Sequence, residues 1–322
     1  MEKVLIKKKQ SFGYSFKRKL SSSKFLIMMI IPAIVYYILF CYVPMYGVLI
    51  AFTYYSPRLG ITGSIFNNWV GFDNFAEVFK LPGFWKVFTN TMFIGSMKII
   101  ISFVSAVLMA ILINELRMKF FKKSVQIIVT FPHFLSWVVV ASLFFLLFDS
   151  TSGLSRAIVS AGGTPLSIFT DGKKFLALVF TSDIWKEAGW SSIIYIATMA
   201  GISSDLYEAA NIDGASRIQK IWHVTLPGIK STAILLLIMS VGGVFSAGFD
   251  QIFNMTNHLN NKTVLGTVQI LDTLVYQIGL VSKTPNRFAE SSALGLFKSV
   301  IGFFLVIITD RIAKLCGERG II

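Results

Sequence analysis

Residues 203–227 read SSDLYEAANIDGASRIQKIWHVTLP, a long polar stretch with helical periodicity between two strongly apolar segments. We call these residues the knob, because the pattern predicts two short helices set at an angle. In the first helix, Leu206 and Ala210 lie four residues apart and so share one face. Asp213 and Gly214 then end it, since glycine relieves the backbone where the chain turns and aspartate tolerates turn geometry.

The second helix of the knob is predicted by Ala215, Ile218 and Trp222, which recur at intervals of three and four residues and form one apolar stripe. We expect Leu226 and Pro227 to end this helix, because proline lacks an amide hydrogen and clashes with the preceding turn. Two interpretations of the stripe are open. It lies on lipid headgroups as an interfacial helix, or it fills a groove on a soluble partner.

The residue string of the knob resembles the EAA loop of ABC-importer permeases, through Glu208-Ala209-Ala210, then Asp213-Gly214-Ala215, then Leu226-Pro227. The resemblance implies that the knob inserts into a cleft on a cytoplasmic ATPase. It assigns electrostatic anchoring to Glu208, close approach to the two alanines, and the turn to Gly214. The coupling residues implied in this way are Glu208, Ala209, Ala210, Asp213, Gly214, Ala215, Ile218, Trp222, Leu226 and Pro227.

Composition places the chain among integral membrane proteins. Of its 322 residues, 54% are hydrophobic and 14% are charged, and the mean hydropathy is +0.69. A helix needs ~20 apolar residues to cross the hydrocarbon. The stretches that satisfy this length are residues 25–52, 91–114, 125–148, 177–201, 231–255 and 291–309. Because these runs are continuous, we predict an all-α integral membrane fold of six transmembrane helices. The first run is too long for a signal peptide, so we expect it to be retained.

Positive charge is concentrated in alternate hydrophilic segments, which predicts an orientation. The net charge is +14, and lysine and arginine gather before residue 25, at 117–123, at 217–230 and after residue 310. The positive-inside rule then places both termini and the knob in the cytoplasm. We divide the chain into a basic cytoplasmic tail (1–24), a transmembrane permease domain (25–310) with the knob as its coupling loop, and a cytoplasmic C-terminal tail (311–322).

The same charge pattern favours lipid over nucleic acid as a partner. The basic tail is expected to lie on anionic headgroups. No aromatic or base-reading module accompanies the lysines, so nucleic acid is not expected to bind. Cys41 lies in the first span and Cys316 in the C-terminal tail, so we expect neither a disulfide nor a metal site.

Polar and aromatic side chains in the outer halves of the fourth and fifth spans are the candidates for a substrate path. They are Asp183, Trp185, Lys186, Glu187, Trp190 and Tyr195 in the fourth span, and Asp250, Gln251 and Asn254 in the fifth. Polar groups at that depth must face protein or water, and aromatic faces beside hydrogen-bonding groups suit a sugar ring and its hydroxyls. The alternative for Asp183 and Glu187 is an ion-paired entrance to a span that starts later, near Trp185.

Two further segments resemble carbohydrate permeases of the maltose-uptake type. WVGFDNFAEVF (69–79) resembles the segment that precedes the core of those permeases. FDQIFN (249–254) resembles the pattern that ends their fifth span near the translocation path.

Three isolated ionisable residues in the spans have open interpretations. Lys98 is a functional candidate because it is a charge inside a bilayer, or it snorkels to the interface about 10 Å away. His133 either shuttles protons or is a satisfied packing residue beside Pro132. Lys298 lies about 18 Å from the end of its span, which favours a partner inside the bundle.

The sequence contains no GxxxxGK[ST] phosphate loop, so energy for transport has to come from another subunit. The resemblance implies a type I ABC-importer permease of a bacterial cytoplasmic membrane, which passes an oligosaccharide inward by alternating access. It also implies a heterodimer with a second, related permease, two ATPase subunits that bind ATP and magnesium, and an extracytoplasmic solute-binding protein. The chain itself is then no enzyme and holds no cofactor.

Other functional classes stay open at this point. A permease for peptides or amino acids would share the knob. A membrane enzyme acting on lipid-linked sugars would need clustered acidic residues, for which Asp183 and Glu187 are the candidates. A channel or a secondary carrier would transport its solute without an ATPase.

Overall fold

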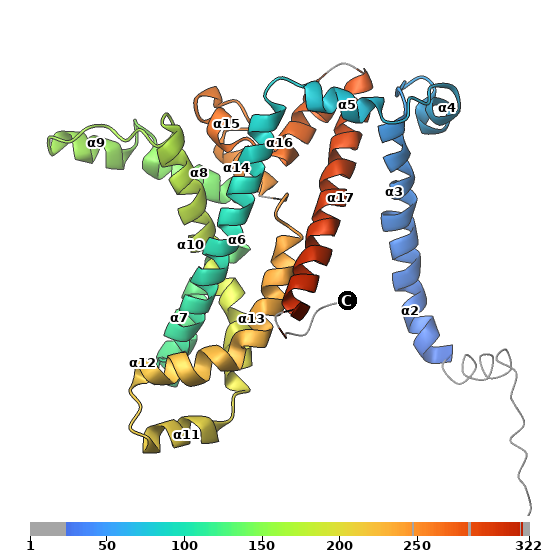
Figure 1. Ribbon diagram of the computed structural model, residues 1–322. Helices are drawn as coiled ribbons and strands as arrows, with labels where there is room; N and C mark the ends of the chain where they lie inside the picture. The colour runs from blue at the N-terminus through green and yellow to red at the C-terminus, as the bar shows by residue number, and fades with distance from the viewer. Residues whose placement is uncertain (1–23, 247, 283–284, 316, 318–322) are drawn as a thin grey trace, which may run out of the picture.

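The computed structural model describes residues 24–246, 248–282, 285–315 and 317, so residues 1–23 of the predicted basic tail, Cys316 and residues 318–322 lie outside the described part. Within these ranges the chain is built from helices, and its only β-bridge is an isolated antiparallel one between Thr53 and Trp69. The long helices after residue 84 run along one bundle, with the knob at one end and several short helices at the opposite end, and the first span, Met28–Phe52, stands apart from them (Figure 1). We call that opposite end the far end.

The first part of the chain forms α2 (Lys24–Tyr37), the π-helix η1 (Ile38–Tyr42), α3 (Val43–Met45), the 3₁₀-helix η2 (Tyr46–Phe52), α4 (Gly60–Asn67) and α5 (Asp73–Lys80). The middle part forms α6 (Phe84–Asn114), α7 (Lys119–Thr130), the 3₁₀-helix η3 (Phe131–Phe134), α8 (Trp137–Phe148), α9 (Gly153–Ser160) and α10 (Gly172–Ala200). The knob and the span after it form α11 (Ser204–Ile212), α12 (Arg217–Lys220), the π-helix η4 (Ile221–Thr225) and α13 (Leu226–Val241). The last part forms α14 (Phe249–Met255), α15 (Lys262–Val268), α16 (Leu271–Tyr276), the π-helix η5 (Gln277–Val281) and α17 (Pro285–Leu315).

Five helical segments among the described residues are long and apolar enough to cross a membrane. They are Met28–Phe52, Phe84–Asn114, Trp137–Ser160, Arg217–Val241 and Asn286–Leu315. The fourth predicted span is α10, which has 29 residues but carries Asp183, Lys186 and Glu187 near its middle. Because α10 packs along α6 at the centre of the bundle, its charged side chains can meet protein groups and not lipid. The prediction of an all-α, six-helix architecture is confirmed.

The start of α10 is fixed by an N-cap. The Asp171 Oδ1 atom accepts hydrogen bonds from the amides of Lys173 at 2.9 Å and Lys174 at 3.2 Å. These amides, Lys174 first, hold the pKa of the Asp171 carboxyl below its ordinary value.

The third predicted span, 125–148, is not one continuous helix, which corrects the sequence expectation. Pro132 has no amide hydrogen to continue the backbone ladder, and Leu135 and Ser136 adopt extended conformations with ψ of 136° and 152°. A new helix, α8, starts after them because the Ser136 hydroxyl accepts the Val139 amide at 3.4 Å. The chain therefore changes direction inside the bundle between η3 and α8.

The expectation that Leu226 and Pro227 end the second knob helix is wrong, because the helix continues from α12 through η4 into α13. The π-turn η4 lies directly before this pair, and the Leu226 amide donates to the Ile221 carbonyl. Such a turn widens the helix, so the proline ring is accommodated in the first turn of α13. The knob is thus joined rigidly to the span that follows it.

The fifth predicted span, 231–255, is also interrupted, since α13 ends at Val241 and α14 begins at Phe249. Glycines make the interruption possible. Gly248, which precedes α14, has a φ of +94°, a left-handed conformation that side-chain-bearing residues rarely adopt.

Two further glycines allow the long helices to approach closely. A Cβ atom on Gly95 of α6 would lie 2.0 Å from the Val244 carbonyl oxygen, and one on Gly189 of α10 would lie 2.0 Å from the Val129 carbonyl oxygen. Small residues at helix contacts drive packing in membranes, where lipid tails remove the hydrophobic advantage. The Gly95 contact brings α6 against the interruption after α13, and the Gly189 contact brings α10 against the end of α7.

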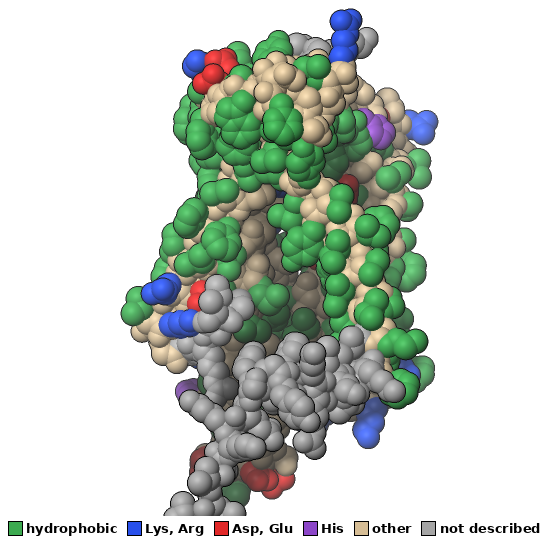
Figure 2. Space-filling model, turned by 90° about the vertical axis from the view of Figure 1, so that its right-hand side faces the viewer, with side chains coloured by type: hydrophobic (Ala, Val, Ile, Leu, Met, Phe, Trp, Pro, Cys, Tyr) green, Lys and Arg blue, Asp and Glu red, His purple; other side chains and the backbone are tan. Residues whose placement is uncertain are grey.

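The outer surface agrees with a membrane setting. Hydrophobic side chains cover the middle of the visible face, whereas charged side chains gather toward its two ends (Figure 2). The same face is hollowed at mid-height.

Candidate functional sites

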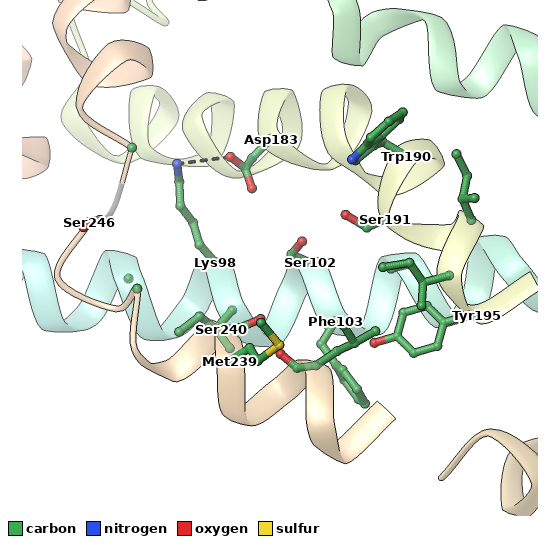
Figure 3. A pocket seen from close by; sticks show the side chains of 18 residues that line it. Lys98, Ser102, Phe103, Asp183, Trp190, Ser191, Tyr195, Met239, Ser240 and Ser246 are labelled. Atoms are coloured by element: carbon green, nitrogen blue, oxygen red, sulfur yellow. Dashed lines mark hydrogen bonds and ion pairs between the residues drawn. The ribbon is translucent and has the colours of Figure 1, made fainter. Parts of the chain in front are cut away.

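A cavity of about 630 Å³ opens between α6, α10, α13 and the residues just before α14 (Figure 3). Its polar lining consists of Lys98, Ser102, Asp183, Ser191, Ser240 and Ser246. Its aromatic lining consists of Phe103, Trp190 and Tyr195. A space of this size, with mostly apolar walls and a few polar groups, is typical of small-molecule sites.

Lys98 is held inside the bundle, so the snorkelling interpretation is wrong. Its Nζ atom lies 3.1 Å from the Asp183 Oδ1 atom and donates to the Gln251 Oε1 atom. The side chains of Lys98 and Asp183 are only 12% and 17% exposed. Breaking a pair this far from water would leave an uncompensated charge, so the pair is part of the fold as well as of the cavity wall.

Gln251 fixes this ion pair from behind. Its side chain is fully buried, and its Nε2 atom donates to the Val179 carbonyl at 2.7 Å and to the Ser182 hydroxyl at 2.9 Å. Both donors therefore point to α10, which leaves the amide oxygen facing Lys98. Gly248 permits this geometry, because a Cβ there would lie 2.6 Å from the Lys98 Nζ atom.

The other two candidates of the fifth span lie elsewhere. Asp250 is exposed, and the Asn254 amide donates to its backbone carbonyl at 2.7 Å. In the described part of the chain neither residue belongs to the cavity lining. Whether either of them contacts a substrate stays a prediction.

Lys186 and Glu187 of α10 face the break between η3 and α8 and not the cavity. The buried Lys186 ammonium donates to the His133 carbonyl at 2.5 Å and lies 3.5 Å from the Pro132 carbonyl. It also lies 3.4 Å from Glu187 and 5.6 Å from the ring centre of Trp137. Lys186 thus supplies the hydrogen bonds that the interrupted helix has lost.

His133 has two specific contacts. Its Nδ1 atom lies 2.7 Å from the Glu187 Oε2 atom, and its ring stacks on Trp190 with centres 4.3 Å apart and planes 2° apart. The imidazole of His133 therefore has partners inside the bundle, as the packing interpretation expects, and the proton-shuttle role stays a prediction. Trp185 points away from this group and meets Phe144 edge-on at 6.0 Å.

The deep lysine of the last span also has a partner in the bundle, as expected. Lys298 pairs with Asp272 and lies 3.5 Å from the Ser246 hydroxyl. This second ion pair joins α17 to α16 beside the interruption that precedes α14.

Asp183, Trp190 and Tyr195 are therefore the predicted path residues that line the cavity, while Ser102, Ser191, Ser240 and Ser246 were missed. One signal for them exists. On α6, Gly95, Lys98, Ser102 and Ala106 recur at three and four residues and form a stripe of small and polar side chains. Serines on the other elements carry no such pattern.

The knob exposes its apolar side chains. Ile212, Ile218 and Trp222 are 86%, 68% and 65% exposed, and Glu208 is exposed beside them. Gly214 makes the turn with a φ of +73°. Ala209 and Pro227 are exposed, whereas Ala210, Ala215 and Leu226 are half-buried and Asp213 is exposed at the turn.

Internal contacts fix the angle between the two knob helices. The Lys220 ammonium donates to the Asn211 Oδ1 atom at 2.7 Å. The Tyr207 hydroxyl lies 3.0 Å from the Thr225 hydroxyl. A capping box formed by Ser216 and Gln219 starts α12.

Metal ligands are not clustered in the described residues, where no group of three His, Cys, Asp or Glu side chains converges. Cys41 is exposed on the first span. Cys316 lies outside the described residues, so the expectation that the two cysteines form no disulfide stays a prediction.

Comparisons with known proteins identify related chains. The profile of one family, described as "Binding-protein-dependent transport system inner membrane component", matches residues 102–319. The polygalacturonan/rhamnogalacturonan transport system permease protein YteP of Bacillus subtilis (strain 168) is 41% identical over 304 residues, or 94% of this chain and 92% of the relative. Protein LplB of the same organism is 38% identical over 310 residues, or 96% and 94% of the two chains.

Solved structures agree with these relatives. A chain of a bacterial ABC transporter involved in the import of the acidic polysaccharide alginate superposes with a TM-score of 0.82 at 30% identity and covers 93% of this chain and 98% of that one. The alginate transporter in complex with an alginate pentasaccharide-bound periplasmic protein gives the same TM-score at 29% identity, over 94% and 99% of the two chains.

Proposed function

We propose a substrate class and a coupling route for this chain from one premise: it belongs to the family of binding-protein-dependent transport system inner membrane components. It is therefore a multi-pass membrane permease of a binding-protein-dependent sugar importer and not an enzyme. The finer points below concern what it carries and how it is driven.

The substrate is an oligosaccharide that passes through the cavity between α6, α10 and α13. The observation that carries this proposal is the lining, which combines four serine hydroxyls and the Lys98–Asp183 pair with three aromatic rings. Sugars need both kinds of surface, because their ring faces are apolar and their hydroxyls require donors and acceptors. The names of the polygalacturonan and alginate relatives support the same class.

The knob is the site where one subunit of the ATPase pair acts on this permease. Its exposed Ile218 and Trp222 lie four residues apart on the helix formed by α12 and η4, the spacing of a helix that fills a groove, and Ile212 is exposed at the end of α11. ATP and magnesium belong to those subunits, since this sequence has no phosphate loop. To switch the permease almost completely, ATP has to favour the closed state by about 5.5 kcal/mol.

A second permease covers surface that this chain leaves open. The first span shows no buried residue in its apolar window, and it meets α17 through η2 at the far end (Figure 1). A helix of this length with so few contacts in its own chain suits a neighbour in the membrane. With the knob in the cytoplasm, the binding protein docks on the short helices of the far end.

Reconstitution tests this function directly. The assembled complex is placed in proteoliposomes with ATP available to the ATPase subunits, and uptake is measured for trigalacturonate, maltotriose and a tripeptide. We expect uptake of at least one oligosaccharide that requires both ATP and the binding protein. Uptake by the isolated chain without an ATPase, or uptake of the tripeptide alone, would contradict the proposal.

A further inference from the structure

Trp190 is an aromatic side chain of the cavity that is held by rings from outside the cavity lining. It is 43% exposed, so its own helix does not enclose it. In Figure 3 the indole stands at the edge of the cavity, with its nitrogen directed toward the interior. A large side chain in such a place loses rotamer freedom when a ligand binds, unless the protein has already fixed it.

The break after α7 brings two rings against this indole. His133 stacks on its face with centres 4.3 Å apart, and Phe134 meets it nearly at a right angle, at 5.7 Å and 82°. Both rings come from η3, the short turn that ends where the predicted third span is interrupted. A continuous helix would place these two residues differently around its axis, because successive residues are about 100° apart.

The stacked imidazole is itself fixed at two points. Its Nδ1 atom lies 2.7 Å from Glu187, and its backbone carbonyl accepts from the Lys186 ammonium at 2.5 Å. Glu187 and Trp190 are three residues apart on α10 and so lie on neighbouring positions of one face. His133 is therefore wedged between a carboxylate and an indole that belong to the same helix.

We propose that His133 is a positioning residue for transport, which holds the Trp190 indole in the orientation that meets the sugar. This inference rests on the proposed function, because it assumes that the cavity carries the oligosaccharide. The group of Lys186, Glu187 and His133 then has a purpose that packing alone does not require. Lys186 satisfies the carbonyls of the break, but a carboxylate and an imidazole inside a membrane bundle are costly where apolar residues could fill the same space. A carboxylate–imidazole contact, by contrast, sets the plane of the ring.

The test compares His133→Ala with His133→Phe in the assembled complex. Phenylalanine keeps a flat ring for stacking but has no nitrogen, so it separates the stacking role from any proton chemistry. For the oligosaccharide that the wild type takes up, trigalacturonate or maltotriose, we expect His133→Ala to raise KM about 3- to 10-fold with little change in the maximal rate. His133→Phe should restore part of the wild-type KM, because its ring still stacks on Trp190 but no longer has the Glu187 contact that sets the ring plane.

A spectroscopic measurement needs no substrate. The Trp190 contribution to near-ultraviolet circular dichroism is obtained as the difference between wild type and Trp190→Leu, and the same difference is measured in each His133 background. We expect it to be large in wild type, intermediate in His133→Phe and small in His133→Ala. In transport, His133→Ala should add nothing to the effect of Trp190→Leu, because both remove the same oriented ring.

Two results would overturn the inference. The first is a His133→Ala protein with unchanged KM and unchanged dichroism. The second is a His133→Phe protein as defective as His133→Ala. The second result would assign the role to the imidazole nitrogens. Absence of ATP-dependent uptake in the wild type would instead count against the proposed function, and the dichroism would still decide whether His133 orders Trp190.

Discussion

The middle of α10 and the knob follow one another along the chain, but they differ in where their costly side chains find partners. Charged side chains of α10 are paired inside the protein, whereas apolar side chains of the knob are exposed. In α10, Asp183, Lys186 and Glu187 all find partners within the protein. In the knob, Ile212 and Trp222 are largely exposed. A charge away from water has to be compensated by the fold itself, whereas apolar side chains at an aqueous end can be covered by another molecule.

This difference separates two kinds of defect. Changes in α10 should reduce the stability of the permease, because its partners are internal. Changes in the knob should reduce transport while leaving the chain folded, because its proposed partner is another subunit. The variants below are ordered by their expected effect on stability.

The largest effect is expected for Gly189→Val in α10. A Cβ at this position would lie 2.0 Å from the Val129 carbonyl oxygen, which is backbone and cannot rotate away. Overpacking typically costs ~1–3 kcal/mol when side chains can shift, and here the two helices themselves would have to separate, so the cost should exceed that range. We expect little folded protein in detergent, measured as the monodisperse fraction in size-exclusion chromatography.

Gly295→Ala is the matched control for this glycine, because no heavy atom lies within 4 Å of its added Cβ. It should behave as wild type. Equal yields of the Gly189→Val and wild-type proteins would show that α7 and α10 do not need their close contact.

The second effect is expected for Lys98→Met, which leaves Asp183 without its cation and Gln251 without its donor. Removing one partner of a buried ion pair typically costs about 3–5 kcal/mol. The thermal unfolding midpoint in detergent should fall clearly. Adding Asp183→Asn should recover part of the loss, because the unpaired charge is then removed.

Lys80→Met tests the opposite case, since the side chains of Lys80 and its partner Glu77 are 70% and 54% exposed. Exposed pairs contribute little, so its midpoint should stay at the wild-type value. A Lys98→Met midpoint equal to that of Lys80→Met would mean that the cavity pair is not part of the fold.

In the knob, Gly214→Asp should leave stability nearly intact and abolish transport. The left-handed backbone at Gly214 is tolerated by aspartate better than by most residues, and the added side chain points into open space, so the cost to the fold is about 1 kcal/mol. The new charge lies on the surface proposed to enter the ATPase. Membrane insertion, ATPase co-purification and uptake are measured together.

Normal uptake by a stably inserted Gly214→Asp protein would rule out the docking role. It would favour the alternative in which the knob lies on lipid headgroups. Loss of uptake with normal ATPase binding would place the defect after docking.

Two prolines show why the sequence predicted the membrane spans better than the points where the helices are interrupted. The sequence indicated the positions of the long helices because apolar length is a local property. After Pro132 the helix stops, and at Pro227 it continues through the preceding π-turn. The outcome at Pro132 depends on Lys186, which is distant in sequence and satisfies the carbonyls freed by the break. Neither periodicity nor proline content contains that information.

The candidate cavity was found in part for a similar reason. Asp183, Trp190 and Tyr195 were visible because polar and aromatic residues are unusual in a membrane span. Lys186 is equally unusual but turns toward η3, and Ser240 is too common in apolar helices to stand out. Which face of a helix meets a cavity is decided by its neighbours, so single spans could not give the complete lining.

A similarly small effect on stability is expected where the knob does have an internal partner. Tyr207 of α11 and the buried Thr225 of η4 join their hydroxyls at 3.0 Å, so this contact ties the first knob helix to the widened turn before α13. Tyr207→Phe removes one hydrogen bond, which is worth about 1 kcal/mol, and should lower the thermal midpoint only slightly.

Because α13 continues directly from the knob, a looser contact should transmit motion less completely, and more ATP should be hydrolysed for each sugar imported. Thr225→Val should give the same change in the ratio of ATP hydrolysis to uptake, and the double variant should add nothing, since both remove one shared bond. Additive effects of the two substitutions would show that the hydroxyls act separately. The Tyr207–Thr225 contact would then not couple the knob to α13.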